Sequence, residues 1–307
     1  LCSERRSPQY IKRRYKKMKH IKTTFIGGDL RQISAAGYFS GIGAEARVWG
    51  FEKCRLPDGV TGYTSFEEAC DGADAIILPL PYGKDGEINC PMTEKEVTLG
   101  ALLNCVDEKT VIMGGRLDEK AYSLAAAHNN KIIDYYGREE LSVLNAVPTA
   151  EGALEVAIRE LPVTLFGSRV AIIGFGRIGK VLAKVLCGLG SDVTVFARKP
   201  EAKAWARVYG CKAEDTSKMS EYLSGFVCIF NTVPAPVLGK AELYSVRHDA
   251  VIIDLASAPG GVDKGAAEET GVRVISALSL PGRVAPESAG EIIAETAVNI
   301  LFQEGIL

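Results

Sequence analysis

The sequence predicts an α/β protein built from two doubly wound domains of parallel β-sheet. Its 307 residues amount to about two domains of typical size. Short runs rich in β-branched residues alternate with longer stretches of helical periodicity, which is the pattern of parallel α/β units. A hydrophobic content of 47% and a charged content of 24% allow sizeable cores and exclude a disordered or repetitive chain.

Residues 18–144 are expected to form the first domain. Ser65 and Thr93 are each followed by Glu three positions later, so each predicts a helix start with a capping box. We expect strands at 23–27, 47–51, 73–78, 110–113 and 131–134, and helices at 29–40, after Ser65, from Thr93 toward Asn104 and at 118–128.

Residues 145–285 are expected to form the second domain. The segment 145–152 predicts a loop that leads into a helix over 153–161, and this helix joins the domains. Residues 286–307 predict a final helix, from about Glu287 to Phe302, that packs back on the first domain. We expect strands at 169–173, 192–196, 226–231, 251–254 and 272–276, with helices between them.

The first 17 residues differ from the rest of the chain in charge. They carry seven basic side chains and one acidic side chain, a net charge of +6, whereas the remaining residues carry −8. Such an arm is compatible with nucleic acid or an acidic membrane. However, Met18 leads directly into the first predicted strand. In addition, the codons of Arg13 and Arg14 could form a ribosome-binding sequence upstream of a start codon at Met18. We therefore expect residues 1–17 to be a non-native or disordered leader, with no nucleic-acid partner.

The cysteines and the hydropathy pattern bear on the compartment. The eight cysteines are scattered without a CxxC pair, and several lie in apolar segments, where a free thiol behaves as a small hydrophobe. The uninterrupted apolar runs are far shorter than the ~18 residues that cross a bilayer. We expect a reduced, cytoplasmic protein that has no membrane partner and binds no metal.

A glycine-rich stretch in the second half is the most informative motif. Gly174, Gly176 and Gly179 follow an apolar strand and open a helix, and a further strand comes next. In this context the pattern is the dinucleotide fingerprint of a Rossmann domain. The first glycine allows the tight turn, the second the approach of the pyrophosphate and the third close packing of helix on strand. The helix N-terminus offers free N–H groups to the phosphates.

The end of the second strand of this domain bears on the choice of cofactor. NAD sites usually place an acidic residue there, where this chain has Ala197, Arg198 and Lys199. The two cations suit a 2′-phosphate, so NADP is favoured and NAD remains possible. Two further strand ends belong to the same site, because ligands lie outside the carboxyl ends of parallel strands. The expected cofactor-binding residues are Gly174, Phe175, Gly176, Arg177, Ile178, Gly179, Ala197, Arg198, Lys199, Asn231, Thr232, Val233, Pro234, Leu255, Ala256 and Ser257.

Two arginines of the first domain are candidates for binding an anionic substrate. Arg31 and Arg116 each follow a predicted strand end, and arginine is suited to bidentate binding of a carboxylate. A surface salt bridge is the alternative role for each. Gly27 and Gly28 also open a helix, but a third glycine and a phosphate-binding lysine are missing, which disfavours a second phosphate site.

Several of these motifs together resemble the A-subunit family of dipicolinate synthase. The resemblance covers residues 18–307, and its specific segments are 145–152, 254–261 and 280–290. It implies NADP-dependent formation of pyridine-2,6-dicarboxylate from a reduced dicarboxylic precursor in the mother cell of a spore-forming bacterium. It also implies a partner, the flavoprotein-like B-subunit of dipicolinate synthase, and a homo-oligomer remains possible. Family members often have Arg where Ala258 stands, so any substrate contact of that arginine falls to another group here.

Four polar residues of the second domain are candidates for catalysis. The candidates are Asn145, Thr149, Glu151 and Ser257, although Thr149 and Glu151 also suit a helix cap. One alternative is a D-2-hydroxyacid dehydrogenase, which is disfavoured because none of His20, His128 and His248 follows a strand end of the nucleotide domain. A second alternative is a non-catalytic NADP-binding regulatory subunit.

Overall fold

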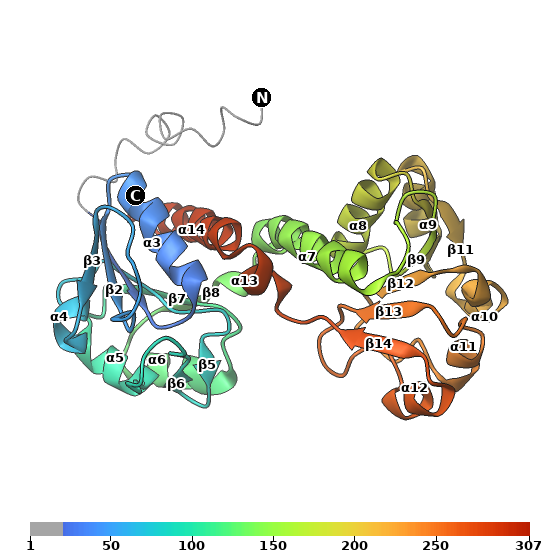
Figure 1. Cartoon of the computed structure of the whole chain (residues 1–307). Coiled ribbons are helices and arrows are strands. Elements are labelled where there is room, and N and C mark those ends of the chain that lie inside the picture. Colours follow the sequence, from blue (N-terminus) through green and yellow to red (C-terminus); the bar gives the residue numbers. More distant parts are fainter. Residues whose placement is uncertain (1–20) are drawn as a thin grey trace. The chain divides into compact units, whose positions relative to one another are not determined.

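The computed structural model describes residues 21–307, which form two compact units (Figure 1). Unit 1 contains the described residues up to Leu144 together with Ala285–Leu307, and unit 2 is Asn145–Val284. The first boundary falls inside helix α7 (Glu139–Glu160). The leader expected at residues 1–17 lies outside the described part of the chain.

Unit 1 is built on a parallel sheet of six strands in the order β3-β2-β1-β4-β7-β8. Strands β1 and β4 are neighbours in the middle of the sheet. The strands that follow β1 extend the sheet to one side, and those from β4 onward extend it to the other side. Ligands of doubly wound proteins bind at such a switch point. The strands are β1 Lys22–Ile26, β2 Glu45–Trp49, β3 Val60–Tyr63, β4 Ala75–Ile77, β7 Val111–Gly114 and β8 Ile132–Asp134, and a small hairpin joins β5 Gly83–Lys84 to β6 Glu87–Ile88.

Helices cover both faces of this sheet, because alternate strand residues point to opposite sides. Phe25 and Ile77 belong to the core under α3 (Leu30–Gly41) and α14 (Pro286–Gln303). Ile26 and Ile76 belong to the core on the other face. The helices of that second face are α4 Phe66–Cys70, α5 Leu99–Cys105 and α6 Glu119–Ala127, and a 3-10 turn, η1 Tyr135–Gly137, follows β8.

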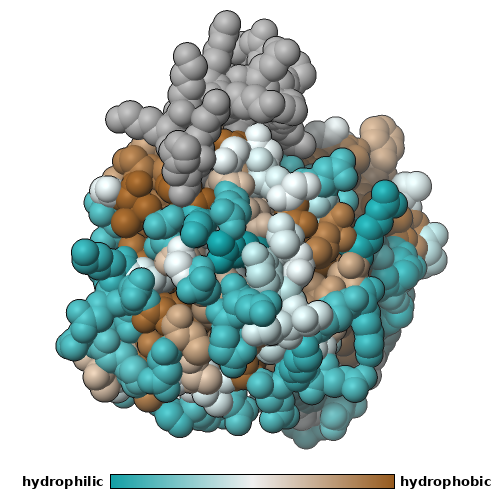
Figure 2. All heavy atoms as spheres, turned by 90° about the vertical axis from the view of Figure 1, so that its left-hand side faces the viewer, coloured by the Kyte–Doolittle hydropathy of each residue, from teal (hydrophilic) through white to brown (hydrophobic). Residues whose placement is uncertain are grey.

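The outer surface of unit 1 is largely polar on the side turned to the viewer in Figure 2. Hydrophobic residues form separate patches there, between charged and polar side chains. Isolated apolar patches of this kind are normal on a surface in contact with water.

Unit 2 repeats the strand order of unit 1. Its six parallel strands are arranged β11-β10-β9-β12-β13-β14, with the switch point between β9 and β12. The predicted fold class, two doubly wound parallel sheets, is therefore confirmed. The strands are β9 Arg169–Ile173, β10 Asp192–Phe196, β11 Lys212–Glu214, β12 Cys228–Asn231, β13 Val251–Asp254 and β14 Arg273–Ser276.

The helices of unit 2 also pack on two faces of the sheet. Val170 and Ile172 of β9 belong to the core that also contains residues of α8 (Arg177–Gly188) and of the second half of α7, whereas Ala171 and Ile173 belong to the opposite core. The remaining helices are α9 Pro200–Val208, α10 Met219–Tyr222, α11 Lys240–Tyr244, α12 Lys264–Thr270 and α13 Leu280–Val284, with 3-10 turns η2 Thr216–Lys218 and η3 Leu223–Gly225.

Helix α7 is continuous through residues 145–152, which the sequence predicted as a loop. Pro148 lies inside the helix and removes one main-chain donor. The hydroxyl of Thr149 donates to the Asn145 carbonyl, four residues earlier in the same helix, over 2.7 Å. The alanines of this helix that follow Pro148 are completely buried, so tertiary packing outweighs the helix-breaking residues.

The length and composition of α7 also fit a membrane span. Half of its apolar window is buried inside the structure, and the core helix of a soluble protein passes the same test. This single helix is therefore weak evidence for a membrane span.

The predicted capping box at Thr93 is wrong. Residues 93–98 run back along the hairpin instead: the Ile88 N–H donates to the Val97 carbonyl over 3.0 Å. Helix α5 begins only afterwards, with Thr98 as its N-cap. The helix start predicted at Ser65 is formed, since the Ser65 hydroxyl accepts from the Glu68 N–H and α4 begins there. Residues 280–284 form the short helix α13.

Candidate nucleotide and substrate sites

The glycine turn of unit 2 connects the first strand of its sheet to helix α8. Gly174 has a φ of +90°, a conformation that favours glycine, and its N–H donates to the Phe196 carbonyl over 2.9 Å. A Cβ on Gly179 would clash with the Gly174 carbonyl oxygen, so this residue permits close packing of helix on turn. Two of the predicted roles of the glycines therefore have a direct structural basis.

The middle glycine leaves an open space. A Cβ on Gly176 would meet no atom within 4 Å, and the residue is exposed. Gly176 is also the N-cap of α8, and the first turn of this helix receives no side-chain cap. The first N–H groups of a helix without a cap are donors for an anion, and the helix dipole favours negative charge there. The turn therefore fits the pyrophosphate of a dinucleotide.

Three cations follow β10, and they differ in their partners. Lys203 pairs with Asp215 over 2.8 Å, and the hydrogen bond from Lys203 lowers the pKa of Asp215 to about 2. Lys199 is 78% exposed and lies 3.9 Å from Glu201. Arg198 is exposed and has no ion pair within the described part of the chain. Arg198 is therefore the cation most available to a 2′-phosphate.

The ends of β12 and β13 are joined by buried side chains. The Asn231 amide donates to Asp254 Oδ1 over 2.8 Å and to the Val233 carbonyl over 3.1 Å. Asn231 is completely buried, and these bonds let it position the segment 232–234. Its contact with the cofactor stays a prediction. Thr232 is similarly engaged, since its hydroxyl donates to the Ile173 carbonyl.

Asp254 holds the loop that follows β13, a role that the sequence alone did not indicate. The residue is 8% exposed, and its carboxylate accepts from the Asn231 amide and from the main-chain N–H groups of Ala256 and Gly261. These bonds hold the loop 255–261, in which Leu255 and Ala256 are buried and Ser257 is exposed. The signal that was overlooked is an acidic residue at the end of an apolar strand, seven residues before a glycine.

We expect Asp254→Ala to lower the free energy of unfolding by about 2–4 kcal/mol. The change leaves one N–H of the Asn231 amide and two main-chain N–H groups without an acceptor in a buried place. Each loss costs about 1–3 kcal/mol before relaxation. Urea denaturation would measure the effect, with the exposed Asp249→Ala as a control of the same residue type. A loss below ~1 kcal/mol would contradict a structural role for Asp254.

The four catalytic candidates occupy different environments in unit 2. Thr149 uses its hydroxyl inside α7, where it donates to the Asn145 carbonyl. Asn145 is half-buried, whereas Glu151 and Ser257 are exposed. Glu151 is the carboxylate of this set, and carboxylates accept protons at neutral pH. The role of each candidate stays a prediction.

In unit 1, Arg31 is largely committed to its own neighbourhood. Its guanidinium donates to both carboxylate oxygens of Asp29 and to the Leu80 carbonyl, and the side chain is 15% exposed. The charge of Arg31 is thus neutralised within unit 1 by a salt bridge. A salt bridge is the alternative role that the sequence left open for this residue. This pairing argues against Arg31 as a carboxylate-binding residue.

Arg116 is arranged differently. It has a φ of +59°, and Asp134 holds this turn by accepting from the Arg116 and Leu117 N–H groups. The guanidinium lies over the ring of Tyr136, with its central carbon 5.8 Å from the ring centroid, and the residue is exposed. The side chain has no ion pair within the described residues. Arg116 is therefore a positioned cation that follows the carboxyl end of β7.

The glycine turn of unit 1 is closed by its own chain. The Gly28 N–H donates to the Asn89 carbonyl over 2.7 Å, and a Cβ on Gly27 would meet Cys90 Sγ at 2.5 Å. Asp29, the N-cap of α3, accepts from the Arg31 N–H. The donors that would hold a phosphate are therefore taken, which agrees with the argument against a second phosphate site here.

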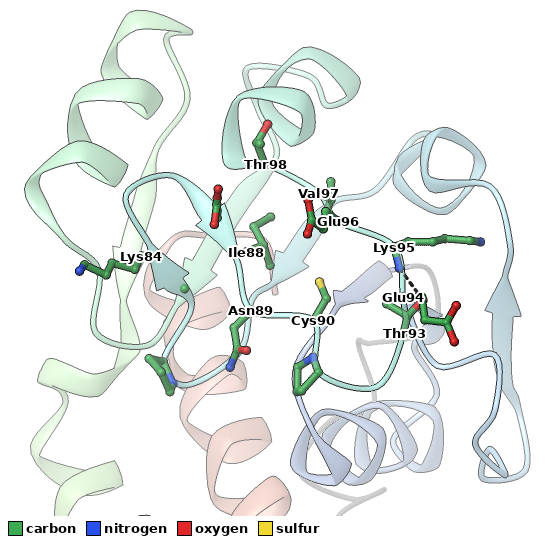
Figure 3. Close-up of a pocket in the computed structure, with 14 residues that line it drawn as sticks. Lys84, Ile88, Asn89, Cys90, Thr93, Glu94, Lys95, Glu96, Val97 and Thr98 are labelled. Carbon is green, nitrogen blue, oxygen red and sulfur yellow. Dashed lines mark hydrogen bonds between the residues drawn. The ribbon is translucent and has the colours of Figure 1, made fainter.

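A hollow of about 780 Å³ lies beside this closed turn (Figure 3). Ile88, Cys90 and Val97 contribute apolar surface, and burial raises the pKa of the Cys90 thiol to about 11. Glu87, Glu94 and Glu96 line the hollow together with Lys84 and Lys95, and Lys95 is paired with Glu52. Carboxylates therefore outnumber the available cations, and we expect the substrate cation elsewhere in the unit. Metal-ligand clusters are absent from residues 21–307.

Comparisons with known proteins agree with this division into two units. Residues 22–136 match the model of the N-terminal domain of the dipicolinate synthase A-subunit, and residues 149–266 match that of the D-isomer specific 2-hydroxyacid dehydrogenase NAD binding domain. The dipicolinate synthase A-subunit of Bacillus subtilis (strain 168) is 31% identical over 288 residues, which are 92% of this chain and 96% of that protein. The chain belongs to the A-subunit family of dipicolinate synthase. It is thus a dehydrogenase-like protein with a nicotinamide dinucleotide site in unit 2.

Solved structures support the same assignment. The crystal structure of the dipicolinate synthase A-subunit from Bacillus halodurans has a TM-score of 0.83 at 30% identity, over 92% of this chain and 97% of that chain. A transhydrogenase from Sinorhizobium meliloti has a TM-score of 0.68 at 18% identity, over 92% and 94% of the two chains, which shows the fold alone. The match to the family model of 2-hydroxyacid dehydrogenases, at residues 149–266, lies within the nucleotide unit.

Proposed function

We propose that the chain catalyses the NADP-dependent oxidation of a dihydrodipicolinate-type precursor to pyridine-2,6-dicarboxylate. The relationship over 96% of a dipicolinate synthase A-subunit is the observation that carries this proposal. The open glycine turn and the uncapped start of α8 support a dinucleotide in unit 2. The exposed guanidinium of Arg116 supports an anionic substrate at unit 1.

In this proposal the two units have separate tasks. The nicotinamide, when bound, accepts the hydride that the ring loses. The loop 255–261, held by Asp254, shapes the nicotinamide end of the site. Arg116 binds one carboxylate of the substrate, and Glu151 accepts the proton that leaves the ring. Because the product is aromatic, the step is downhill and a strongly tuned acid–base pair is less necessary.

The partner and the setting are further parts of the proposal. We expect the chain to act with the flavoprotein-like B-subunit of dipicolinate synthase, in the cytoplasm of the mother cell of a spore-forming bacterium. The support is the family relationship alone. A second candidate is a regulatory protein that binds NADP without catalysing the reaction.

A reconstituted assay separates these functions. The full chain is mixed with the precursor and NADP⁺, with and without the flavoprotein-like partner, and reduced nicotinamide is followed by absorbance. Formation of NADPH and pyridine-2,6-dicarboxylate without the partner is expected from a self-contained dehydrogenase. If product forms only with the partner and no NADPH appears, the proposed oxidation by this chain is wrong. Turnover of D-2-hydroxy acids at a comparable rate would instead identify a 2-hydroxyacid dehydrogenase.

We expect Arg198→Asp to weaken NADP binding at least tenfold, about 1.4 kcal/mol, because it replaces an available cation with an anion that repels the 2′-phosphate. Calorimetric titration with NADP and NAD would measure it. Lys218→Asp, at an exposed position after β11, is the control for the change in net charge. Equal NADP affinity in the Arg198 variant and the parent would show that the 2′-phosphate is bound by other residues.

A further inference from the structure

Two cysteine thiols of unit 2 are in direct contact. Sγ of Cys187 lies 3.5 Å from Sγ of Cys211, although the residues are 24 positions apart. Cys187 is in the last turn of α8, and Cys211 stands between α9 and β11. Both cysteines are free thiols in the structure. Helices α8 and α9 lie next to each other at the same side of the sheet (Figure 1).

The two thiols differ in their access to solvent. Cys211 is 6% exposed, and its N–H donates to the Ala206 carbonyl at the end of α9. Burial raises the pKa of the Cys211 thiol and so disfavours its thiolate. Cys187 is half-buried and lies at the edge of the same core. A reagent in solution therefore meets Cys187 first, with Cys211 beneath it as a second thiol.

We propose that Cys187 and Cys211 form a reversible disulfide by exchange with a small-molecule disulfide, and that this bond lowers the nucleotide affinity of unit 2. The Cys187 thiolate attacks one sulfur of the reagent, forms a mixed disulfide and releases one small thiolate. Cys211 then loses its proton and attacks Cys187 Sγ, which releases the second small thiolate. The protein loses two electrons and two protons, and the reagent is reduced to two thiols.

The coupling to the nucleotide runs through aromatic contacts. Tyr209, two residues before Cys211, packs edge-on against Phe175 with a centroid distance of 5.7 Å. Phe175 lies between the first two glycines of the turn. A disulfide requires an S–S distance of about 2 Å, so the sulfur atoms must approach by roughly 1.5 Å. We expect this movement to displace Tyr209 and thereby the turn that binds the pyrophosphate.

The chemistry suits a transient bond. Disulfides in a reducing compartment are usually redox-sensing or catalytic rather than structural. Once the mixed disulfide has formed, Cys211 is already in contact with the sulfur atom that it attacks, so proximity favours closure of the bond.

The first experiment tests the bond itself. The full chain is incubated with oxidised glutathione, quenched, alkylated and mapped by mass spectrometry. We expect one linked peptide pair that contains Cys187 and Cys211 and that dithiothreitol removes. Cys187→Ser must abolish this pair, whereas Cys54→Ser, a half-buried cysteine of unit 1, must leave it. Failure to form the pair, or its formation from other cysteines, would overturn the proposal.

The second experiment tests the consequence. Nucleotide affinity is measured by titration with NADPH before and after complete linkage. We expect binding at least threefold weaker in the oxidised protein, restored by dithiothreitol and insensitive to oxidant in Cys187→Ser. Unchanged affinity in fully linked protein would refute the coupling. Neither readout uses the dicarboxylate, so the result is independent of the proposed substrate.

Discussion

Gly176→Val is expected to abolish nucleotide binding, with at least a hundredfold loss of affinity, while the protein still folds. A valine side chain would extend into the space beside Gly176 that holds no protein atom and that the pyrophosphate requires. The backbone at this position has a φ of −81°, which valine adopts readily. The remaining cost is a poorer N-cap, about 1 kcal/mol. Titration with NADPH and a thermal melt together would measure both effects.

The matched control is Gly188→Ala at the other end of the same helix. A Cβ there also meets no atom within 4 Å, so stability and nucleotide affinity should both stay close to those of the parent. Should Gly176→Val bind NADPH as tightly as this control, the dinucleotide does not lie on the glycine turn. A large drop in its melting temperature would instead show that the open space is needed for folding.

Arg116→Ala is expected to abolish turnover of the dicarboxylate while NADP affinity stays within about twofold. The arginine is held in unit 1 by Asp134 and Tyr136, whereas the nucleotide site is in unit 2. Loss of the charge that pairs with a substrate carboxylate removes a charge-assisted hydrogen bond, of which bidentate pairs are the strongest. Steady-state kinetics with the dicarboxylate and titration with NADP would separate the two effects.

Two further variants make this prediction specific. Arg116→Lys keeps the charge without the bidentate geometry and should retain part of the activity, with a raised KM. Arg55→Ala removes another exposed arginine of unit 1 and should leave turnover unchanged. Intact turnover in Arg116→Ala, or an equal loss of NADP affinity, would disprove the proposed division of tasks between the units.

The strands were predictable where local pattern and tertiary context agree. Five strands of unit 2 lie entirely within the strand segments that the sequence predicts. These segments were recognisable because most of their apolar runs end in a turn-forming or polar residue. Strands β3 and β11 were missed because they are short, lie at sheet edges and contain few buried side chains. The hairpin of β5 and β6 was missed because its strands have two residues each.

The part of the nucleotide site that main-chain conformation forms could be predicted from the sequence. The glycine turn follows from steric needs that are visible in the sequence. The roles of Asn231 and Arg31 depend on partners that are distant in the chain, Asp254 and Leu80, and no local pattern indicates such pairs. Helix α7 was misjudged for a related reason, since buried packing around Pro148 outweighs its local propensity.

The identical strand order of the two sheets has a consequence for binding stoichiometry. Each unit has a doubly wound sheet with a glycine turn after its central strand, so fold alone would allow two dinucleotides per chain. In unit 1 the Asn89 carbonyl occupies the place of a phosphate oxygen at the Gly28 N–H. The glycine turn of unit 1 is thus occupied by the chain itself. We therefore expect the protein to bind one dinucleotide per chain at saturation.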